Sequence, residues 1–278
     1  MRLPLLPLAF GWLCSGLAFV ATAAAEDLPA RLGSKVFRFE DLPVKVTPVG
    51  QRRDVADQPS RTLARFESHI STLRPGLESH PPHKHAQEEF IILKEGTLEV
   101  GINGRTTKVG PGSLFFFASN DLHNVHSVGS EAATYLVFNL ATAATQNAPA
   151  EGAEAAAVKG TMGSSIFDWN QLAVAKTETG ERRELFNSRT TTCGSLRCHV
   201  TTLNAKGIPH APHRHPDEEI IVVKEGTIEA TVNGVATTAG PGSICFFASN
   251  DEHGLKNVGD GPATYYVIRV VTELTPKP

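Results

Sequence analysis

One sequence unit occurs twice in this chain of 278 residues, with 130 residues between equivalent positions. His83 corresponds to His213, and residues 116–121 recur as residues 246–251 without a gap. Between residues 83 and 138, roughly half of the positions are identical to their partners, far above the level of unrelated segments. A tandem duplication of this kind restricts the fold to two copies of one domain.

The repeat also predicts the domain boundaries. We expect an N-terminal domain over residues 34–140 and a C-terminal domain over residues 164–274. Residues 141–163 between them are rich in alanine with scattered Gly, Pro, Asn and Gln, and carry no apolar period, which predicts a linker. A short helix over Glu151–Val158 is compatible with this linker.

The local pattern within each copy is that of β structure. Phe90–Leu93 and Thr97–Ile102 are short runs with β-branched residues, and Asn103-Gly104 follows them. This dipeptide favours a two-residue hairpin, whose central residues need positive φ. The second copy repeats it as Asn233-Gly234. Short strands with such turns predict an all-β sandwich or barrel in each copy. We expect the two units to pack together and cover a sheet edge or face.

Four residues of each copy are of the metal-ligand type. His83, His85 and Glu89 share parity, so in an extended chain they point to one side, whereas Glu88 points to the other. A further histidine, His123, follows on a returning strand. The equivalent ligands of the second copy are His213, His215, Glu219 and His253.

Three imidazoles and one carboxylate suit a divalent first-row metal: manganese, iron, copper, nickel or zinc. Magnesium and calcium prefer more oxygen ligands. Four protein ligands leave open positions on an octahedral ion, as catalysis requires. The sequence thus predicts up to two metal ions per chain. The alternative is that the histidines lie on the surface or remain from an inactive site.

These residues resemble the two motifs of the cupin superfamily. His83-Lys84-His85, three residues, Glu89, six residues and Gly96 match the first motif, and Gly110-Pro111-Gly112 through His123 matches the second. Both motifs recur in the second copy, where Asn257 completes the second one, so the chain resembles a bicupin. The resemblance implies two tandem double-stranded β-helix (jelly-roll) barrels.

The chain departs from the cupin pattern in two places. The Pro-x-Gly turn before the last histidine is replaced by residues 118–121 and again by residues 248–251, where Asn and Asp supply the turn. In the first copy Ser127 stands where the motif has Asn, a difference in the surroundings of that site rather than in its ligands.

The resemblance implies several functions. Bicupins of the quercetinase type use this ligand set to bind a chelating, electron-rich substrate and insert dioxygen, so a metal-dependent, dioxygenase-like enzyme on a small organic substrate is our leading hypothesis. The alternatives are a secreted cupin that binds metal or ligand without turnover, a sugar isomerase or lyase, and an oxalate decarboxylase or oxidase. The oxalate enzymes carry an arginine where this chain has His80 and His210, and an acidic lid that is absent here, which disfavours them.

Other recurrent residues are candidates for a role near the metal. Glu89 and Glu219 could take a proton, and His80 and His210 are either acid–base groups at the mouth of each pocket or exposed loop residues. We expect His69 and His199 to pack near the site and orient a ligand. Core packing is the expected use of the aromatic residues Phe115, Phe116, Phe117, Phe246 and Phe247. Carboxylate binding or plain exposure explains the arginine pairs 52–53 and 182–183, to which we assign no function.

The start of the chain has the pattern of an export signal. Met1-Arg2 precedes an apolar run to Ala24, and Ala23-Ala24-Ala25 matches a cleavage site. We therefore predict a signal peptide over residues 1–25 and a periplasmic or secreted protein, with no membrane association after its removal. A retained membrane anchor is the alternative.

Charge and cysteine content limit the partners. The net charge is −3 and the basic residues are dispersed, so a nucleic-acid partner has no electrostatic support. A small-molecule substrate is the expected partner, and association into a homo-oligomer stays open. Cys193 and Cys198 are near enough in sequence for a disulfide, but two unpaired thiols are equally compatible.

Overall fold

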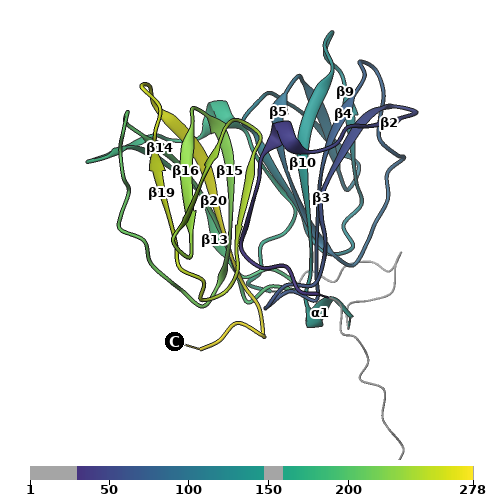
Figure 1. The fold of residues 1–278 in the computed structure, drawn as a ribbon. Coiled ribbons are helices and arrows are strands. Elements are labelled where there is room, and N and C mark those ends of the chain that lie inside the picture. The colour runs from purple at the N-terminus through teal and green to yellow at the C-terminus, as the bar shows by residue number, and fades with distance from the viewer. Residues whose placement is uncertain (1–29, 147–158, 278) are drawn as a thin grey trace, which may run out of the picture.

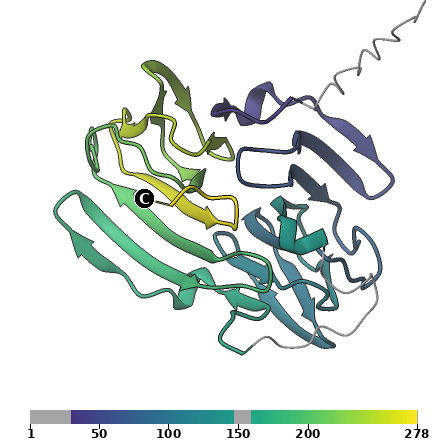
Figure 2. The ribbon, with the colours of Figure 1, turned by 90° about the horizontal axis from the view of Figure 1, so that it is seen from below.

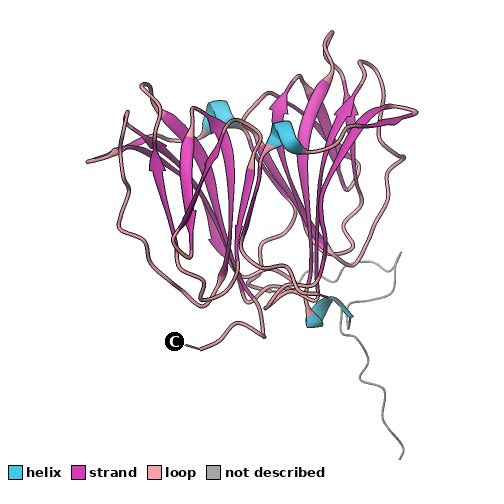
Figure 3. Cartoon of the chain, viewed as in Figure 1, coloured by secondary structure: helices cyan, strands magenta, loops and turns pink. Residues whose placement is uncertain are grey.

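The computed structural model describes residues 30–146 and 159–277, which form two β-barrels side by side (Figures 1 and 3). The predicted signal peptide and the predicted helix at Glu151–Val158 lie outside these residues. Within them, no helix is long and apolar enough to cross a membrane.

The first repeat consists of ten strands, a 3-10 turn and a short terminal helix. Its elements are β1 (Lys35–Phe37), η1 (Phe39–Asp41), β2 (Lys45–Thr47), β3 (Gly50–Gln58), β4 (Arg65–Leu73), β5 (Glu88–Glu95), β6 (Leu98–Ile102), β7 (Arg105–Val109), β8 (Leu114–Phe117), β9 (His123–Ser127), β10 (Ala133–Ala141) and α1 (Ala143–Gln146).

The second repeat has the same strands, each displaced by 130 residues. Its elements are β11 (Ser165–Phe167), η2 (Trp169–Gln171), β12 (Ala175–Thr177), β13 (Gly180–Ser188), β14 (Ser195–Leu203), β15 (Glu218–Glu225), β16 (Ile228–Val232), β17 (Val235–Ala239), β18 (Ile244–Phe247), β19 (His253–Asn257) and β20 (Ala263–Val271).

Each barrel is built from a large and a small antiparallel sheet. In the N-terminal barrel the large sheet has the order β11-β8-β5-β10-β4-β3-β2, and the small sheet has the order β7-β6-β9. The C-terminal barrel repeats this with β1-β18-β15-β20-β14-β13-β12 and β17-β16-β19. Two tandem jelly-roll barrels of nearly pure β structure confirm the predicted fold class.

The first strand of each repeat lies in the sheet of the other barrel. β1 pairs with β18, where Val36 lies opposite Cys245, and β11 pairs with β8, where Ile166 lies opposite Phe115. The ranges 34–140 and 164–274 follow the sequence repeat, but each repeat thus contributes its first strand to its neighbour. The chain path links the barrels at both sheet edges, as seen from below in Figure 2.

The hairpin between β6 and β7 has the turn that its sequence predicts. Asn103 and Gly104 have φ of 49° and 80°, which the left-handed region allows most readily to Asn and Gly. Asn233 and Gly234 repeat this at 47° and 82°. These turns return the chain toward β9, which carries the last predicted ligand.

Strand alternation separates three apolar cores. On β5, Ile91 and Leu93 point into the N-terminal barrel, whereas Phe90 and Ile92 point toward the C-terminal barrel. The inter-barrel core includes Phe66 from the first repeat and other fully buried side chains from both repeats. Because this central core joins side chains of both barrels, we expect neither barrel to be stable with that face exposed.

The cysteines of the described residues are all free. Cys193, Cys198 and Cys245 are buried, so the two predicted alternatives for Cys193 and Cys198 resolve to unpaired thiols. Burial raises the pKa of the Cys245 thiol to about 12, which keeps it protonated and unreactive.

Candidate metal centres

The N-terminal centre joins the segment before β5 to the start of β9. The backbones of His83 and His123 exchange hydrogen bonds of 3.1 and 3.0 Å, which fixes the two histidines side by side. His83, His85 and His123 each place one ring nitrogen within 4.8 Å of the others. Three of the four predicted ligands of this barrel therefore converge on one point.

Glu89 points to the same point from inside the barrel. Its Oε2 lies 3.5 Å from Nε2 of His85, and its side chain is buried. Its neighbour Glu88 faces the other barrel, as the alternation of side chains along β5 requires. The centre thus offers three imidazoles and one carboxylate.

Backbone carbonyls orient the imidazoles. The Nδ1 atoms of His83, His85 and His123 lie 3.2, 2.9 and 2.8 Å from the carbonyl oxygens of His123, Gln87 and Asp121. These contacts favour a proton on Nδ1 and leave Nε2 as the ligand atom. The ring of Phe117 also stacks on His123, with 4.2 Å between centroids.

A buried ring nitrogen tests whether the centre suits a metal. Nε2 of His123 is buried and has no hydrogen-bond partner among the described residues, a costly state for a polar atom. His253 leaves its Nε2 in the same state in the second barrel. A divalent cation would satisfy both atoms, so the residues present fit the predicted cofactor.

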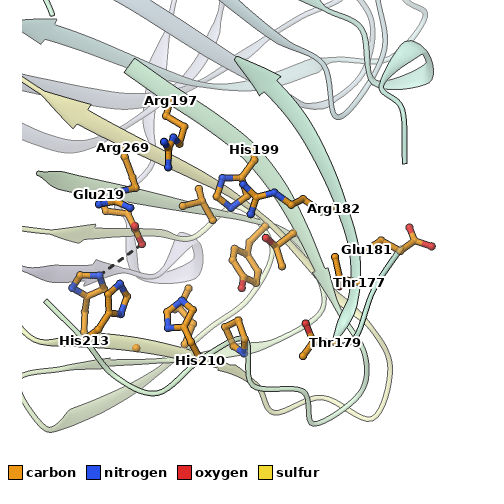
Figure 4. Close-up of a pocket in the computed structure, with 17 residues that line it drawn as sticks. Thr177, Thr179, Glu181, Arg182, Arg197, His199, His210, His213, Glu219 and Arg269 are labelled. Atoms are coloured by element: carbon orange, nitrogen blue, oxygen red, sulfur yellow. Dashed lines mark ion pairs between the residues drawn. The ribbon is translucent and has the colours of Figure 1, made fainter. Parts of the chain in front are cut away.

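The C-terminal centre repeats this geometry. His213, His215 and His253 bring ring nitrogens within 4.8 Å of one another. Glu219 lies 3.3 Å from Nε2 of His215 and 3.9 Å from Nε2 of His253, the latter contact drawn as a dashed line in Figure 4. All eight predicted ligands therefore lie in two equivalent groups of four.

Burial sets the protonation of the N-terminal ligands. It lowers the pKa of His83 to about 4, with a further contribution from His123, so the imidazole is neutral near pH 7. Burial alone raises the pKa of Glu89, but the hydrogen bond with His85 and the charge of His123 outweigh it and lower the pKa. Neutral imidazoles and an ionised carboxylate are the forms that bind metal.

One ligand of the C-terminal centre differs in its electrostatics. Burial lowers the pKa of His215, but hydrogen bonds with Asp217 and Glu219 outweigh it and raise the pKa to about 9. Asp217 in turn binds Arg269, with Nη2 2.7 Å from its Oδ1. The first copy has Gln87 and Asn139 at the positions of Asp217 and Arg269.

The turn before the last histidine is held by the other repeat. Asn120 adopts a φ of 63°, which supplies the turn in place of Pro-x-Gly. The hydroxyl of Ser164 donates to Asp121 at 2.6 Å, and that of Ser34 donates to Asp251 at 2.7 Å. Because Asp121 also orients His123 through its carbonyl, the exchanged segments position a ligand of the opposite barrel.

The predicted acid–base histidines lie at the mouths of the pockets. His80 and His210 are exposed, and their rings lie 4.1 and 4.4 Å from those of His83 and His213. This placement is compatible with proton transfer to a substrate above the metal and equally with an exposed loop.

The arginine pairs divide between two environments. Arg52 and Arg182 line the pockets, whereas Arg53 and Arg183 lie over the rings of Phe39 and Trp169 at 4.6 and 4.5 Å. Parity on β3 and β13 explains the division, because adjacent side chains point to opposite faces.

The phenylalanines pack as predicted, and Asn257 has a structural role. All five phenylalanines of β8 and β18 are fully buried. The amide of Asn257 donates to carbonyls of Asn204 and Gly261 at 2.9 and 2.8 Å, so it ties loops together and contacts no ligand. Ser127 makes no equivalent side-chain hydrogen bond in the described structure.

Each centre lies at the base of an open pocket. The N-terminal pocket has a volume of about 600 Å³ and the C-terminal one about 330 Å³. His69 and His199 line them, and His69 lies 2.8 Å from Glu67 through Nδ1. Figure 4 shows Arg197 and Arg269 on the side of Glu219, with His210 and His213 across the pocket.

Sequence reasoning missed the residues that distinguish the two pockets. Glu67 and Asn139 line the N-terminal pocket, and Arg197 and Arg269 occupy the equivalent positions of the C-terminal one. The available signal was a change of charge between partners 130 residues apart, on strands whose other inward residues match.

The stability of the protein should depend on pH through His199. Burial, followed by the charge of Arg182, lowers the pKa of His199 from 6.5 to about 4. Because the folded pKa lies below the unfolded one, this contribution to stability is complete above the unfolded pKa and is lost as the pH falls through the folded one. Between pH 6.5 and 4.5 we expect the wild type to lose about 2 kcal/mol more than His199→Gln.

Urea unfolding of both proteins in the presence of a chelator measures this difference, since the metal ligands then titrate alike in the two proteins. Equal losses of unfolding free energy in the two proteins would show that His199 does not titrate as its environment indicates.

The fold and the two centres define a class: a two-barrel β protein with a three-histidine, one-glutamate group in each barrel. The family model described as Cupin domain matches residues 69–139 and again residues 199–269. The chain therefore belongs to the cupin domain family, with two such domains in tandem.

Curated relatives and solved structures agree with this assignment. L-ectoine synthase of Vibrio cholerae serotype O1 is 29% identical over 75 residues, 27% of this chain and 54% of the relative, and that of Vibrio campbellii is 31% identical over 90 residues, 32% and 64%. The chain thus spans about half the length of the first relatives it matches.

Two solved structures share the two-barrel fold at low identity. Protein Ylba from E. coli has a TM-score of 0.66 and 11% identity, with 86% of this chain and 90% of that chain covered. A variant of the Bacillus subtilis oxalate decarboxylase OxdC has a TM-score of 0.61 and 18% identity, with 89% and 80% covered. At these identities the likeness shows the fold alone.

Proposed function

We propose that this bicupin binds a divalent transition metal in each barrel and is a metal-dependent enzyme acting on a small organic molecule. The observation that carries the proposal is the convergence of three imidazoles and one carboxylate at the base of an open pocket, with Nε2 of His123 and of His253 otherwise unsatisfied. A purely structural site would be closed, without a pocket above it.

The bound metal would supply Lewis acidity and open coordination positions for a substrate. The chain's own residues would do the rest. Glu89 and Glu219 would balance the charge of the cation and accept a proton, while His80 and His210 would exchange protons at the mouths. The buried rings of Phe117 and Phe247 would hold His123 and His253 in place.

The reaction class that we favour is dioxygenase-like oxidation of a chelating, electron-rich substrate. Support comes from the ligand set and from the N-terminal pocket of about 600 Å³, which has room for an aromatic molecule. The oxalate reaction is the second candidate. It draws on the fold shared with the oxalate decarboxylase and on the basic residues of the C-terminal pocket.

Metal content measured on protein isolated from periplasm or culture medium tests the proposal. We expect about two ions per wild-type chain and about one in each of His83→Ala and His213→Ala. His126→Ala is the matched control, since His126 lies on β9 outside the ligand group, and it should keep both ions. Oxygen uptake with a catechol and carbon dioxide release from oxalate then separate the two reaction classes.

A binding protein without turnover would give a different result. In a catalytic centre azide should reach the metal and change its spectrum, whereas a closed site should not respond. Wild-type protein that neither contains nor takes up metal would overturn the proposal.

We also propose that the protein is exported and acts in the periplasm or medium, on the strength of residues 1–25. A mature N-terminus at Glu26, measured by mass spectrometry of the extracytoplasmic protein, is the expected result. A full-length chain that starts at Met1 and stays with the membrane would indicate a retained anchor.

A further inference from the structure

The charged residues that line the two pockets differ in sign. The N-terminal pocket has two arginines and three carboxylates: Arg52, Arg65, Asp57, Glu67 and Glu89. The C-terminal pocket has three arginines and two carboxylates: Arg182, Arg197, Arg269, Glu181 and Glu219. Since the metal ligands themselves are the same, this difference lies in the part of each pocket that would contact a substrate.

The basic groups of the N-terminal pocket are all paired. Arg52 binds Glu67 at 2.9 Å, and Arg65 binds Asp57 through two hydrogen bonds of 2.6 and 2.9 Å. Glu67 also accepts a hydrogen bond from Asn139 at 2.8 Å. This network leaves no guanidinium available to an anion.

The C-terminal pocket lacks this network, because Arg197 stands in the place of Glu67. Arg269 is held by Asp217, and Arg182 by Glu184. The guanidinium of Arg197 has neither a hydrogen bond nor an ion pair with any described residue. It faces the pocket beside Arg269 (Figure 4). An arginine beside another arginine without a counter-ion attracts an anion.

We propose that the C-terminal centre takes a small carboxylate substrate and that Arg197 is the residue that selects it. The planar guanidinium binds a carboxylate through two parallel hydrogen bonds, which leaves the rest of the molecule within the pocket of about 330 Å³. The N-terminal centre, with Glu67 at that position, does not select for a carboxylate. The two barrels therefore differ in substrate, and this inference rests on the proposed function above.

Binding of a matched pair of probes tests the inference. Succinate carries two carboxylates, and succinamide is its neutral counterpart of similar shape. In metal-loaded His83→Ala, which keeps only the C-terminal centre, titration calorimetry should give succinate about tenfold or more tighter binding than succinamide. Metal-loaded His213→Ala should bind the two probes alike.

Substitutions at position 197 then assign the preference to one side chain. In the His83→Ala background, Arg197→Gln should remove the preference, and Arg197→Lys should keep part of it because a charge remains without the fork. Arg189→Gln removes an exposed arginine that lines neither pocket, and should leave the preference unchanged. Metal content and thermal unfolding, measured for each variant, confirm that the protein is folded and loaded.

The outcomes separate the inference from the proposed function. A loaded C-terminal centre that binds both probes equally, or that keeps its preference in Arg197→Gln, overturns the inference and leaves the metal centres intact. If no metal binds, the proposed function fails, and the same titrations of metal-free protein decide the inference. Succinate binding that depends on Arg197 still supports carboxylate recognition there, and its absence overturns it.

Discussion

Replacing Phe66 with alanine should destabilise the protein by about 3–5 kcal/mol, the usual cost of truncating a buried phenylalanine. Phe66 is fully buried between the barrels, with its ring centroid 5.0 Å from that of Phe246 and 6.4 Å from that of Phe138. The substitution therefore leaves a cavity bordered by both repeats. Urea unfolding followed by circular dichroism measures the loss.

The control for this prediction is Val46→Ala, since the Val46 side chain is 86% exposed and its truncation should change stability little. Because the central core belongs to both barrels, Phe66→Ala should shift one cooperative transition rather than split it. A variant as stable as the wild type, or one that loses only a separate N-terminal transition, would show that the barrels do not share this core.

The fold was predictable because its signals are local. The Asn-Gly turns, the short β-branched runs and the gap-free repeat each specify structure from neighbouring residues. The exchange of the first strands was not, because β1 and β11 have only three residues each. So short a segment carries no information on register or partner, and its place depends on which sheet edge remains uncovered.

The metal ligands were predictable for a related reason. Their parity on an extended chain places His83, His85 and Glu89 on one face, and the same alternation assigns Glu88 to the other. What Glu88 contacts could not be derived, because its partners lie about one hundred residues away in a loop of the second repeat. The identities at position 130 further on showed only that Glu218 shares the same environment.

The pocket walls were the least predictable part of the site. The residues that distinguish the pockets lie at the ends of β4, β10, β14 and β20, where a strand pattern alone does not say which side chains reach the metal. The pairs Glu67 with Arg197 and Asn139 with Arg269 are therefore informative only once both barrels are superimposed on the repeat. Divergence between duplicated sites then identifies specificity, whereas identity identifies the ligands.

Glu88 and Glu218 join the barrels through a reciprocal pair of buried carboxylates. Glu88 accepts hydrogen bonds from the amide of Thr191 at 2.8 Å and from the hydroxyl of Thr192 at 2.8 Å, and Thr190 donates as well. Glu218 accepts from the hydroxyl of Ser60 at 2.6 Å and from the amide of Arg61 at 3.0 Å. Each carboxylate thus holds the loop between the third and fourth strands of the other repeat.

Glu88→Ala is expected to lower the free energy of unfolding by about 2–4 kcal/mol, because it leaves the buried donors of residues 190–192 without an acceptor. Glu218→Ala should have a similar effect, and the two losses should add, since the loops lie in different repeats. Chemical denaturation of the two single variants and the double variant measures this.

Glu95→Ala provides the control, because the Glu95 side chain is 61% exposed and pairs only with Lys94 at the surface. Burial raises the pKa of Glu88, although the threonine hydrogen bonds oppose this, so the carboxylate depends on those donors when it is ionised. Glu88→Gln should therefore fall between the wild type and the alanine variant, since its amide keeps one acceptor and turns the other toward donors. Loss of stability in Glu88→Ala no greater than in Glu95→Ala would mean that these hydrogen bonds contribute nothing to holding the barrels together, and that the apolar core alone joins them.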